Sequence, residues 1–194
     1  MGIGISLLAI LEEGPTYGFH LKNEFERRTG GIWDLNVGQV YTTLGRLQRD
    51  GLVASESTEG SDVQKMYGIT KEGRQQLRAW FEEPSAVGPP SRDERLLKLV
   101  MVARRGPVQA ADVIQAERRS AVQLLQEYTR LKQTNAEEHD LGCVFLLDSL
   151  IFAAEARVRW LDACEARLSS YARRRHEPSP SSAAIPTEVE ELQS

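Results

Sequence analysis

The segment LNVGQVYTTLGRLQRDGLV, residues 35–53, constrains the fold of this chain more than any other segment. Its apolar residues recur at roughly helical spacing, and Gly51 stands where a helix would stop. The other positions carry hydrogen-bonding side chains, namely Gln39, Thr42, Thr43, Arg46 and Arg49. The segment predicts a short helix with one buried face and one polar face. That polar face is either plainly solvated or in contact with a partner that needs hydrogen bonds.

Two helices are expected before this one. The first carries an apolar face at residues 7–11 and ends at the Gly-Pro pair 14–15. Thr16 is the expected N-cap of the second helix, which the Gly-Gly pair 30–31 closes. Asn36 is then the expected N-cap of the third helix.

A β-hairpin and a fourth helix are expected after the third helix. Residues 52–57 and 65–70 are short, partly alternating segments on either side of the turn-forming residues 58–62, which predicts two strands. Thr70 is the expected cap of a helix that ends at Pro84. Three helices, a hairpin and a further helix, in this order, predict a winged helix-turn-helix.

The remainder of the chain is expected to be helical. Residues 85–92 are rich in Pro, Gly and Ser and predict a linker between two domains. The predicted fold is therefore mainly α. It has an N-terminal winged helix-turn-helix at 1–84 with a small two-stranded β-hairpin, followed by a C-terminal all-helical dimerisation domain at 93–175. The tail at 176–194 is acidic and Ser/Pro-rich, which predicts disorder.

One long helix, expected from about 141 to 173, carries an apolar stripe suited to packing against another helix. The stripe consists of Leu147, Ile151, Ala154, Val158, Leu161 and Leu168. We interpret it as the dimerisation surface, with packing against the helix expected at 108–135 as the alternative. Glu165 interrupts the stripe, so a strict coiled coil is not expected.

The net charge, the cysteines and the hydropathy argue against a strongly basic nucleic-acid binder, a disulfide-bonded secreted protein and a membrane protein. The formal net charge is −4, so any affinity for DNA must come from a few locally placed cations. Cys143 and Cys164 lie too far apart along one helix to form a disulfide, which fits buried thiols in a reducing cytosol. No apolar run is long enough to span a membrane, and no signal peptide is evident. We expect a cytoplasmic protein without a membrane partner.

Enzymatic and metal chemistry find little support in the sequence. The chain has three scattered histidines, and His139 with Cys143 is the one spacing that resembles a metal pair. Neither a phosphate-binding glycine loop nor a nucleophile elbow is present in the sequence. We expect no catalytic activity, no metal and no resident cofactor.

The polar face of the third helix has the chemistry of a DNA-reading surface. Gln39, Thr42 or Thr43, and Arg46 share an outer face, where glutamine suits adenine and arginine suits guanine in the major groove. The hairpin adds Gln64 and Lys65 for phosphate or minor-groove contacts.

Two stretches of the chain resemble the PadR family of bacterial transcriptional regulators. They are EEGPTYGFHLKNEFERRTGGIWDLNVGQVYTTLGRLQRDGLV and KMYGITKEGRQQLRAWF. The family's usual run of a Gly-Pro turn, a Gly-aromatic-x-Leu helix start and a Gly-Gln-x-Tyr recognition helix appears at 14–15, 18–21 and 38–41. The resemblance covers most of the first 85 residues, whereas the C-terminal helices fit the family in general plan.

The resemblance implies a homodimeric repressor that small aromatic or phenolic ligands release from DNA. It implies that Gln39, Tyr41, Thr42 and Arg46 lie on the DNA-facing helix. It also implies that Tyr17 and Lys22 lie on the preceding helix near the DNA backbone, with Lys65 on the wing. The candidate DNA-binding residues are Tyr17, Lys22, Asn36, Gln39, Tyr41, Thr42, Thr43, Arg46, Gln64 and Lys65.

Three departures from the family's pattern bear on affinity. Thr42 replaces the usual proline, Gly45 stands where the family often has a basic residue, and the wing keeps only Lys65 of several cations. We expect modest affinity for DNA that falls steeply with salt.

The sequence predicts a sequence-specific DNA-binding transcriptional regulator, a ligand-responsive homodimeric repressor acting at a double-stranded operator with paired half-sites. The candidate effector pocket, for a small aromatic ligand, consists of Trp80, Phe145, Phe152 and Trp160, which are otherwise core residues. The alternative function is a winged-helix protein-interaction module or co-regulator with weakened DNA binding.

Overall fold

The computed structural model describes residues 2–57, 65–85, 93–134 and 141–176. The chain divides into two compact units, 1–91 with 127–151 and 92–126 with 152–194. This division crosses two long helices, so the domain boundaries expected at 84 and 93 stay a prediction. Gln64, the tip of the hairpin, almost all of the expected linker and the tail beyond 176 lie outside the described residues.

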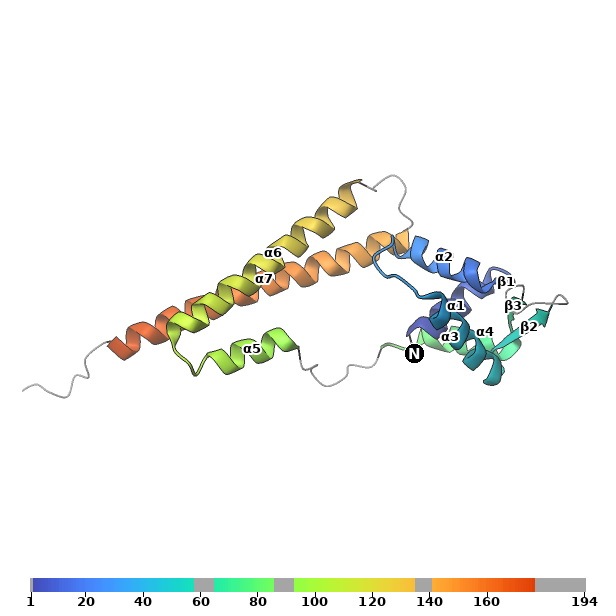
Figure 1. Ribbon diagram of the computed structural model, residues 1–194, viewed down its shortest axis with the longest axis horizontal. Coiled ribbons are helices and arrows are strands. Elements are labelled where there is room, and N and C mark those ends of the chain that lie inside the picture. Colours follow the sequence, from blue (N-terminus) through green and yellow to red (C-terminus); the bar gives the residue numbers. More distant parts are fainter. Residues whose placement is uncertain (1, 58–64, 86–92, 135–140, 177–194) are drawn as a thin grey trace, which may run out of the picture. The chain divides into compact units, whose positions relative to one another are not determined.

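The secondary structure follows the predicted order of a winged helix-turn-helix and then long helices (Figure 1). The elements are α1 (Gly2–Glu12), β1 (Thr16–Tyr17), α2 (Gly18–Arg28), α3 (Val37–Arg49), β2 (Val53–Ser57), β3 (Lys65–Ile69), α4 (Lys71–Glu82), α5 (Glu94–Val102), α6 (Pro107–Thr134) and α7 (Leu141–His176). Among the described residues, no helix is long and apolar enough to cross a membrane.

Helix α1 forms the centre of the first unit. It contacts α2, α3, α4 and β3, and its side chains Leu7, Leu8 and Leu11 are at most 1% exposed. An apolar helix that is covered on several sides belongs in a core, where each buried leucine contributes about 2 kcal/mol of hydrophobic free energy. From α3, Val40, Leu44 and Leu47 join the same cluster, as their spacing predicted.

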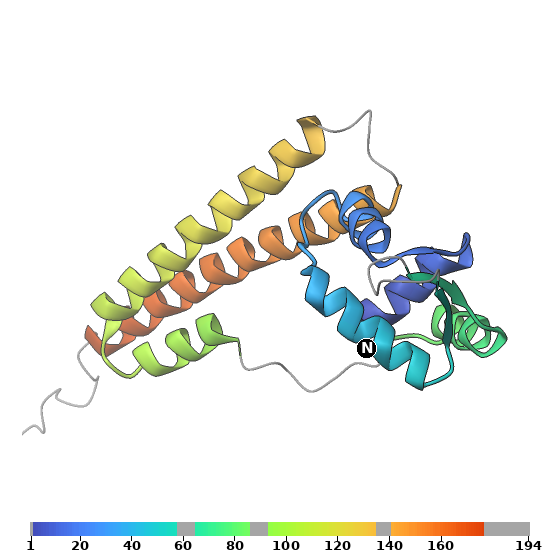
Figure 2. The ribbon, with the colours of Figure 1, turned by 45° about the vertical axis from the view of Figure 1, so that its right-hand side comes forward.

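The wing is a three-stranded antiparallel sheet, ordered β1-β3-β2, rather than the expected two-stranded hairpin (Figure 2). Strand β2 pairs with β3 from Val53 opposite Ile69 to Ser57 opposite Lys65. Thr16 pairs with Tyr67 in the short strand β1, so it is not the N-cap of α2; Tyr17 holds that position. A two-residue strand is too short to show alternation in a sequence, which is why the third strand was missed.

Both ends of α3 are fixed by the contacts that the sequence indicated. The Asn36 side chain accepts a hydrogen bond from the Gly38 amide at 2.8 Å. At the other end Gly51 adopts a φ of +73°, and the Leu52 amide donates to the Leu47 carbonyl at 2.9 Å. This left-handed turn favours glycine and closes the helix with a Schellman-type bond.

Thr70 joins the end of α3 to the start of α4. Its hydroxyl accepts from the Gly73 amide at 3.0 Å, as an N-cap should, and donates to the Gly51 carbonyl at 2.8 Å. The residue predicted as the cap of α4 therefore also holds the turn that leads from α3 into the wing.

The second unit consists of α5, the first part of α6 and the C-terminal part of α7. Its core contains Leu99 from α5, Ile114 and Ala121 from α6, and Leu161 from α7. Asp93 caps α5, because its carboxylate accepts from the Arg95 amide at 2.9 Å.

Most of the apolar stripe on α7 is buried within the chain. Leu147, Ala154 and Leu161 are at most 3% exposed, and Val158 and Leu168 pack against the core of the second unit. Ile151 is half-buried. The alternative interpretation of this stripe, packing against helices of the same chain, therefore accounts for it better than a dimer surface does. A side chain buried within its own chain has little area left for a partner.

Glu165, which interrupts the stripe, forms a polar clamp between α6 and α7. Its carboxylate accepts from Gln115 Nε2 at 2.8 Å and from Arg118 Nη2 at 2.6 Å. Arg118 also forms an ion pair with Asp162 at 2.8 Å. The Arg118 hydrogen bond and charge lower the pKa of Glu165. In the first unit, Lys132 and Asp148 join the same two helices in a second ion pair.

Candidate nucleic-acid interface

The outer face of α3 brings together the side chains predicted to read DNA. Gln39, Thr42 and Arg46 are exposed on this face, as the helical spacing predicted. They border a hollow of about 420 Å³ between α3 and the N-terminal end of α1. Its lining residues are Gly2, Ile3, Gln39, Thr42, Thr43, Arg46 and Arg49.

Arg46 has free hydrogen-bonding capacity on this face. No other described residue forms an ion pair or a hydrogen bond with its guanidinium group. The group passes close to α1, where Nη2 would stand 3.7 Å from a Cβ built on Gly4. All five N–H donors of Arg46 are therefore available to an external acceptor.

Arg49 is a candidate that the sequence analysis did not place on the DNA-facing surface. It lies one helical turn beyond Arg46, is exposed and lines the same hollow. Its Nε donates to the Gly45 carbonyl at 3.3 Å, and no described residue pairs with its terminal nitrogens. Its spacing of three residues from Arg46 was the signal that could have identified it.

The two threonines of α3 have different positions. The Thr42 hydroxyl donates to the Gly38 carbonyl at 2.8 Å, so Thr42 presents its methyl group and an acceptor oxygen. Thr43 is 7% exposed, with its methyl group 3.6 Å from a Cβ built on Gly4. One step along a helix turns the side chain by about 100°, here toward α1, so Thr43 has less surface for a partner than Thr42 and its contact with DNA stays a prediction.

The positions of Tyr41 and Tyr17 differ from those expected of residues that contact DNA directly. Tyr41 lies on α3 but packs over Gly18, where a Cβ would stand 2.7 Å from the Tyr41 Cε1 atom. Tyr17 is not on α2; it lies in β1, pairs with Met66 and is 43% exposed. Tyr41 therefore holds α2 against α3, which sets the geometry of the helix-turn-helix.

Lys22 is engaged within the protein. Its Nζ is 2.6 Å from Glu26 Oε2, and Glu26 Oε1 accepts from the Leu35 amide at 3.0 Å. The Lys22 hydrogen bond is the main cause of a lowered pKa at Glu26. This network ties α2 to the segment that leads into α3, so Lys22 positions the recognition helix more directly than it supplies free charge.

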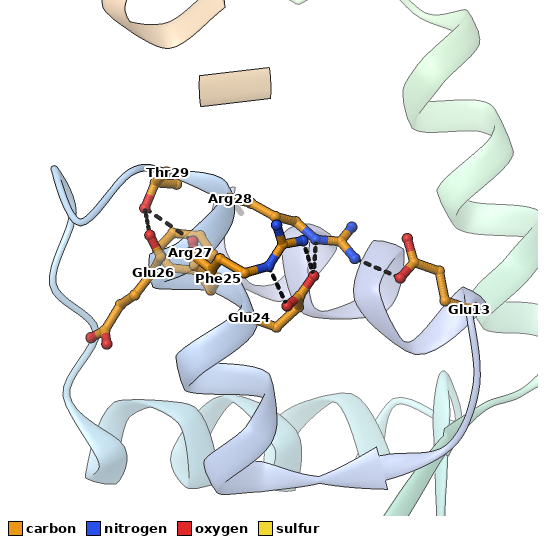
Figure 3. Close-up of polar contacts among 7 residues, drawn as sticks. All are labelled: Glu13, Glu24, Phe25, Glu26, Arg27, Arg28 and Thr29. Atoms are coloured by element: carbon orange, nitrogen blue, oxygen red, sulfur yellow. Dashed lines mark hydrogen bonds and ion pairs between the residues drawn. The ribbon is translucent and has the colours of Figure 1, made fainter. Parts of the chain in front are cut away.

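The basic end of α2 is neutralised by acidic partners, as Figure 3 shows. Glu24 accepts from Arg27 at 2.7 Å and from Arg28 at 2.8 Å, and Arg28 also reaches Glu13 at 2.6 Å. The Arg27 hydrogen bonds, together with those of Arg28, lower the pKa of Glu24 from 4.5 to about 2. Cations near α3, rather than those of α2, therefore have to supply the attraction for phosphate.

Only part of the predicted wing contact lies within the described residues. Lys65 is the first residue of β3, opposite Ser57, and its side chain is half-buried. Gln64 lies just outside. Lys65 therefore stands on the wing, as the resemblance implied, and its contact with DNA stays a prediction.

The four aromatic residues predicted to form one effector pocket are divided between the two units. Trp160 lines a groove in the second unit, and Trp80 lines a hollow beside α1 and α4 in the first. Phe145 and Phe152 are each 64% exposed. A shared aromatic effector pocket therefore stays a prediction, because helical spacing and residue type do not reveal which cavity a side chain faces.

The described ranges contain no group of three or more His, Cys, Asp or Glu arranged to hold a metal ion. Cys143 and Cys164 both lie on α7 and do not form a disulfide; the first is buried and the second half-buried. His139 lies outside the described residues, so the spacing that resembled a metal pair is not tested.

Comparison with known protein families finds a match for each part of the chain. Residues 7–79 match the model of the transcriptional regulator PadR-like family, and residues 91–169 match that of the virulence activator alpha C-terminal family. The chain is 24% identical to the negative transcriptional regulator PadR of Bacillus subtilis (strain 168) over 168 residues, covering 81% of this chain and 92% of that protein.

Two solved structures share the fold. One is Bacillus subtilis PadR in complex with operator DNA, with a TM-score of 0.68 and 19% identity, covering 87% of this chain and 99% of the other. The second is the same protein in complex with p-coumaric acid, with a TM-score of 0.70 and 20% identity, covering 86% and 98%. These similarities support the winged helix-turn-helix followed by a helical C-terminal part.

Proposed function

The chain belongs to the PadR-like family of transcriptional regulators, and we propose that it is a homodimeric repressor released from its operator by a small aromatic ligand. The observation that carries the proposal is the outer face of α3, where Gln39, Thr42 and Arg46 are exposed together and Arg46 has no partner among the described residues.

The major groove is the ligand that this face fits best. A duplex presents acceptor pairs on guanine and donor–acceptor pairs on adenine, and the guanidinium of Arg46 and the amide of Gln39 complement these edges. Thr42 adds a methyl group that suits the methyl of thymine. The relative from Bacillus subtilis, which was solved in complex with operator DNA, supports a duplex as the ligand of this chain.

A dimer is needed because one recognition helix reads too few base pairs for useful specificity. The surface that we propose for it is the face of α7 opposite the buried stripe. Leu141, Phe145 and Phe152 share that face at spacings of four and seven residues, and each is 64% exposed. Large apolar side chains that gather on one exposed helix face are typical of a protein–protein interface.

We propose that the effector is a small aromatic carboxylic acid or phenol and that the protein contains no resident cofactor. The support is the p-coumaric acid complex of the Bacillus subtilis relative. A ligand releases DNA only if it binds the DNA-free conformation more tightly than the DNA-bound one. Ligand and operator must therefore weaken each other's binding by the same factor.

The test is a titration of the purified protein against duplex DNA from its own upstream region and against scrambled duplex, at about 50 and about 200 mM salt. We expect a preference of about a thousandfold for the upstream duplex. Arg46→Ala should reduce this preference, by about 1–3 kcal/mol, and Arg78→Ala, which changes an exposed arginine of α4, should keep it.

Equal weak binding to both duplexes, unchanged in Arg46→Ala, would contradict the proposal. It would favour a winged-helix module that binds proteins instead.

If the specific complex forms, adding p-coumaric acid and related phenols to it tests the effector. A true effector lowers the affinity for operator and leaves binding to scrambled duplex unchanged.

A further inference from the structure

The second unit contains a groove of about 580 Å³ formed by α5, the start of α6 and the C-terminal part of α7. Its walls are almost entirely apolar and aromatic. Among the residues that the structure describes, two charged side chains line it, Arg167 and Arg174, and no acidic side chain does. The groove is therefore an apolar surface with a purely positive margin.

Several large side chains along the groove are uncovered. Val100 is 54% exposed, Leu96 is 44% exposed, and Tyr171 is 50% exposed. A contiguous exposed apolar surface of this kind marks an interaction site. Leu97 and Met101 of α5 do not line the groove, so it is distinct from the rest of the exposed surface of this helix.

The two arginines of the groove lack partners within the part of the chain that the structure describes. Other arginines of the same unit are paired: Arg118 with Glu165, and Arg95 with Asp93. An arginine beside an apolar surface gains most from a carboxylate that it can bind through two hydrogen bonds. The groove thus fits an occupant that has apolar side chains and carboxylates close together.

The chain itself carries such a segment. The sequence beyond α7, EPSPSSAAIPTEVEELQS at 177–194, contains four glutamates and neither lysine nor arginine. Within it Ile185, Val189 and Leu192 recur at helical spacing, and Pro186 stands where the first turn of a helix tolerates proline. We propose that residues 185–192 dock in this groove, with these three apolar side chains on its walls and the neighbouring glutamates paired with Arg167 and Arg174.

The chain has the length needed to reach the groove. Tyr171, which lines it, lies five residues before the end of α7, about 8 Å along the helix axis. Trp160, at its far end, lies about 24 Å from the end of α7. The nine residues from His176 to Ile185 span up to about 30 Å when extended, which covers both distances.

Because the segment belongs to the same chain as the groove, it can occupy the groove even if its intrinsic affinity is weak. A short flexible connection keeps the segment at an effective concentration in the millimolar range. A segment with an intrinsic Kd of about 0.1 mM would then occupy the groove most of the time.

Cys164 supplies a built-in reporter for this docking. It lines the groove and is half-buried, whereas Cys143, the other thiol, is 1% exposed and lies outside it. The experiment compares the rate of alkylation of Cys164 by a maleimide in the full chain and in a chain that ends at His176. We expect the shortened chain to react about tenfold faster and an added synthetic peptide of residues 177–194 to restore protection.

Two full-length variants make the test independent of truncation. Val189→Ala combined with Leu192→Ala removes apolar contacts, and Arg167→Glu combined with Arg174→Glu reverses the charge of the groove. Both should react as fast as the shortened chain. Arg173→Glu is the matched control, since Arg173 is exposed on α7 and does not line the groove; it should react like the unmodified chain.

An alkylation rate that is the same in the full and shortened chains would overturn the proposal. So would protection of the shortened chain that rises with its own concentration, because a second copy would then cover the groove. The assay contains no DNA and no effector, so its outcome is independent of the proposed function as a repressor.

Discussion

The ring of Tyr41 on α3 lies directly over Gly18, the first residue of α2, and a Cβ at position 18 would stand 2.7 Å from the Tyr41 Cε1 atom. Real Cβ contacts are almost never this short, so only glycine allows the two helices to approach this closely. The angle at which α3 is presented therefore depends on a residue without a side chain on the neighbouring helix.

Gly18→Ala should destabilise the protein. The new methyl group has to displace an aromatic ring, which costs about 1–3 kcal/mol of unfolding free energy. Gly45→Ala is the matched control, because Gly45 is exposed on α3 and nothing lies within 4 Å of its Cβ position. It should stabilise the helix by about 1 kcal/mol. Urea unfolding at neutral pH measures both; equal effects of the two variants would contradict the proposed close contact.

Glu24→Gln should remove a pH-dependent contribution to stability. Because Arg27 and Arg28 lower the pKa of Glu24 from 4.5 to about 2, its contribution is complete above the ordinary value and is lost as the pH falls toward 2. The pair is near the surface, so we expect about 1 kcal/mol.

The measurement is the free energy of unfolding of both proteins at pH 7 and pH 2. The difference between Glu24→Gln and the unmodified protein should be present at pH 7 and shrink at pH 2. Glu12→Gln changes an exposed carboxylate at the end of α1 and serves as the control. A difference that is constant over this range would show that the ion pairs of Glu24 do not contribute.

Arg46→Ala and Arg49→Ala should weaken operator binding in different ways. Arg46 is expected to contact a base edge, so its loss should cost about 1–3 kcal/mol and reduce the preference for the operator. Arg49 is expected to contact phosphate, so its loss should weaken binding to every duplex and lower the salt slope by about 1 per subunit. Fluorescence anisotropy at several salt concentrations separates the two; a salt slope unchanged in Arg49→Ala would rule out the phosphate contact.

Phe145→Asp combined with Phe152→Asp should produce a monomer. Both side chains are 64% exposed on one face of α7, and a carboxylate buried at that interface would lack a partner. Sedimentation velocity gives the molecular mass directly. Phe81→Asp replaces a phenylalanine of α4 that is 66% exposed and should leave the dimer intact. A dimer that survives both substitutions on α7 would move the interface to another surface.

Glu165→Gln should weaken the contact between α6 and α7. The substitution keeps the shape of the side chain but removes the charge that accepts from Arg118 and Gln115. Because Glu165 is 40% exposed, solvent screens part of the charge, and we expect a small but measurable loss of stability. Glu155→Gln, whose pair with Arg159 spans 3.9 Å at the surface, should change stability by less than about 0.5 kcal/mol. Thermal unfolding of the two variants compares them directly.

The sequence by itself determined the elements whose formation depends on local chemistry. Helical spacing identified the buried side of α3, at Val40, Leu44 and Leu47, and capping chemistry identified Asn36 and Gly51 as its boundaries. These features depend on residues within one or two turns of each other, so the sequence contains all the information that they need.

Only the tertiary structure decided which of several possible faces is covered. Thr43 turns toward α1, Tyr41 covers Gly18, and Thr16 pairs with Tyr67, although these partners lie far apart in the sequence. On α7 the neighbouring helices bury the stripe that includes Leu161 and leave Phe152 exposed. Spacing along a helix shows which side chains share a face. The elements that bury that face come from distant parts of the chain, so spacing does not identify them.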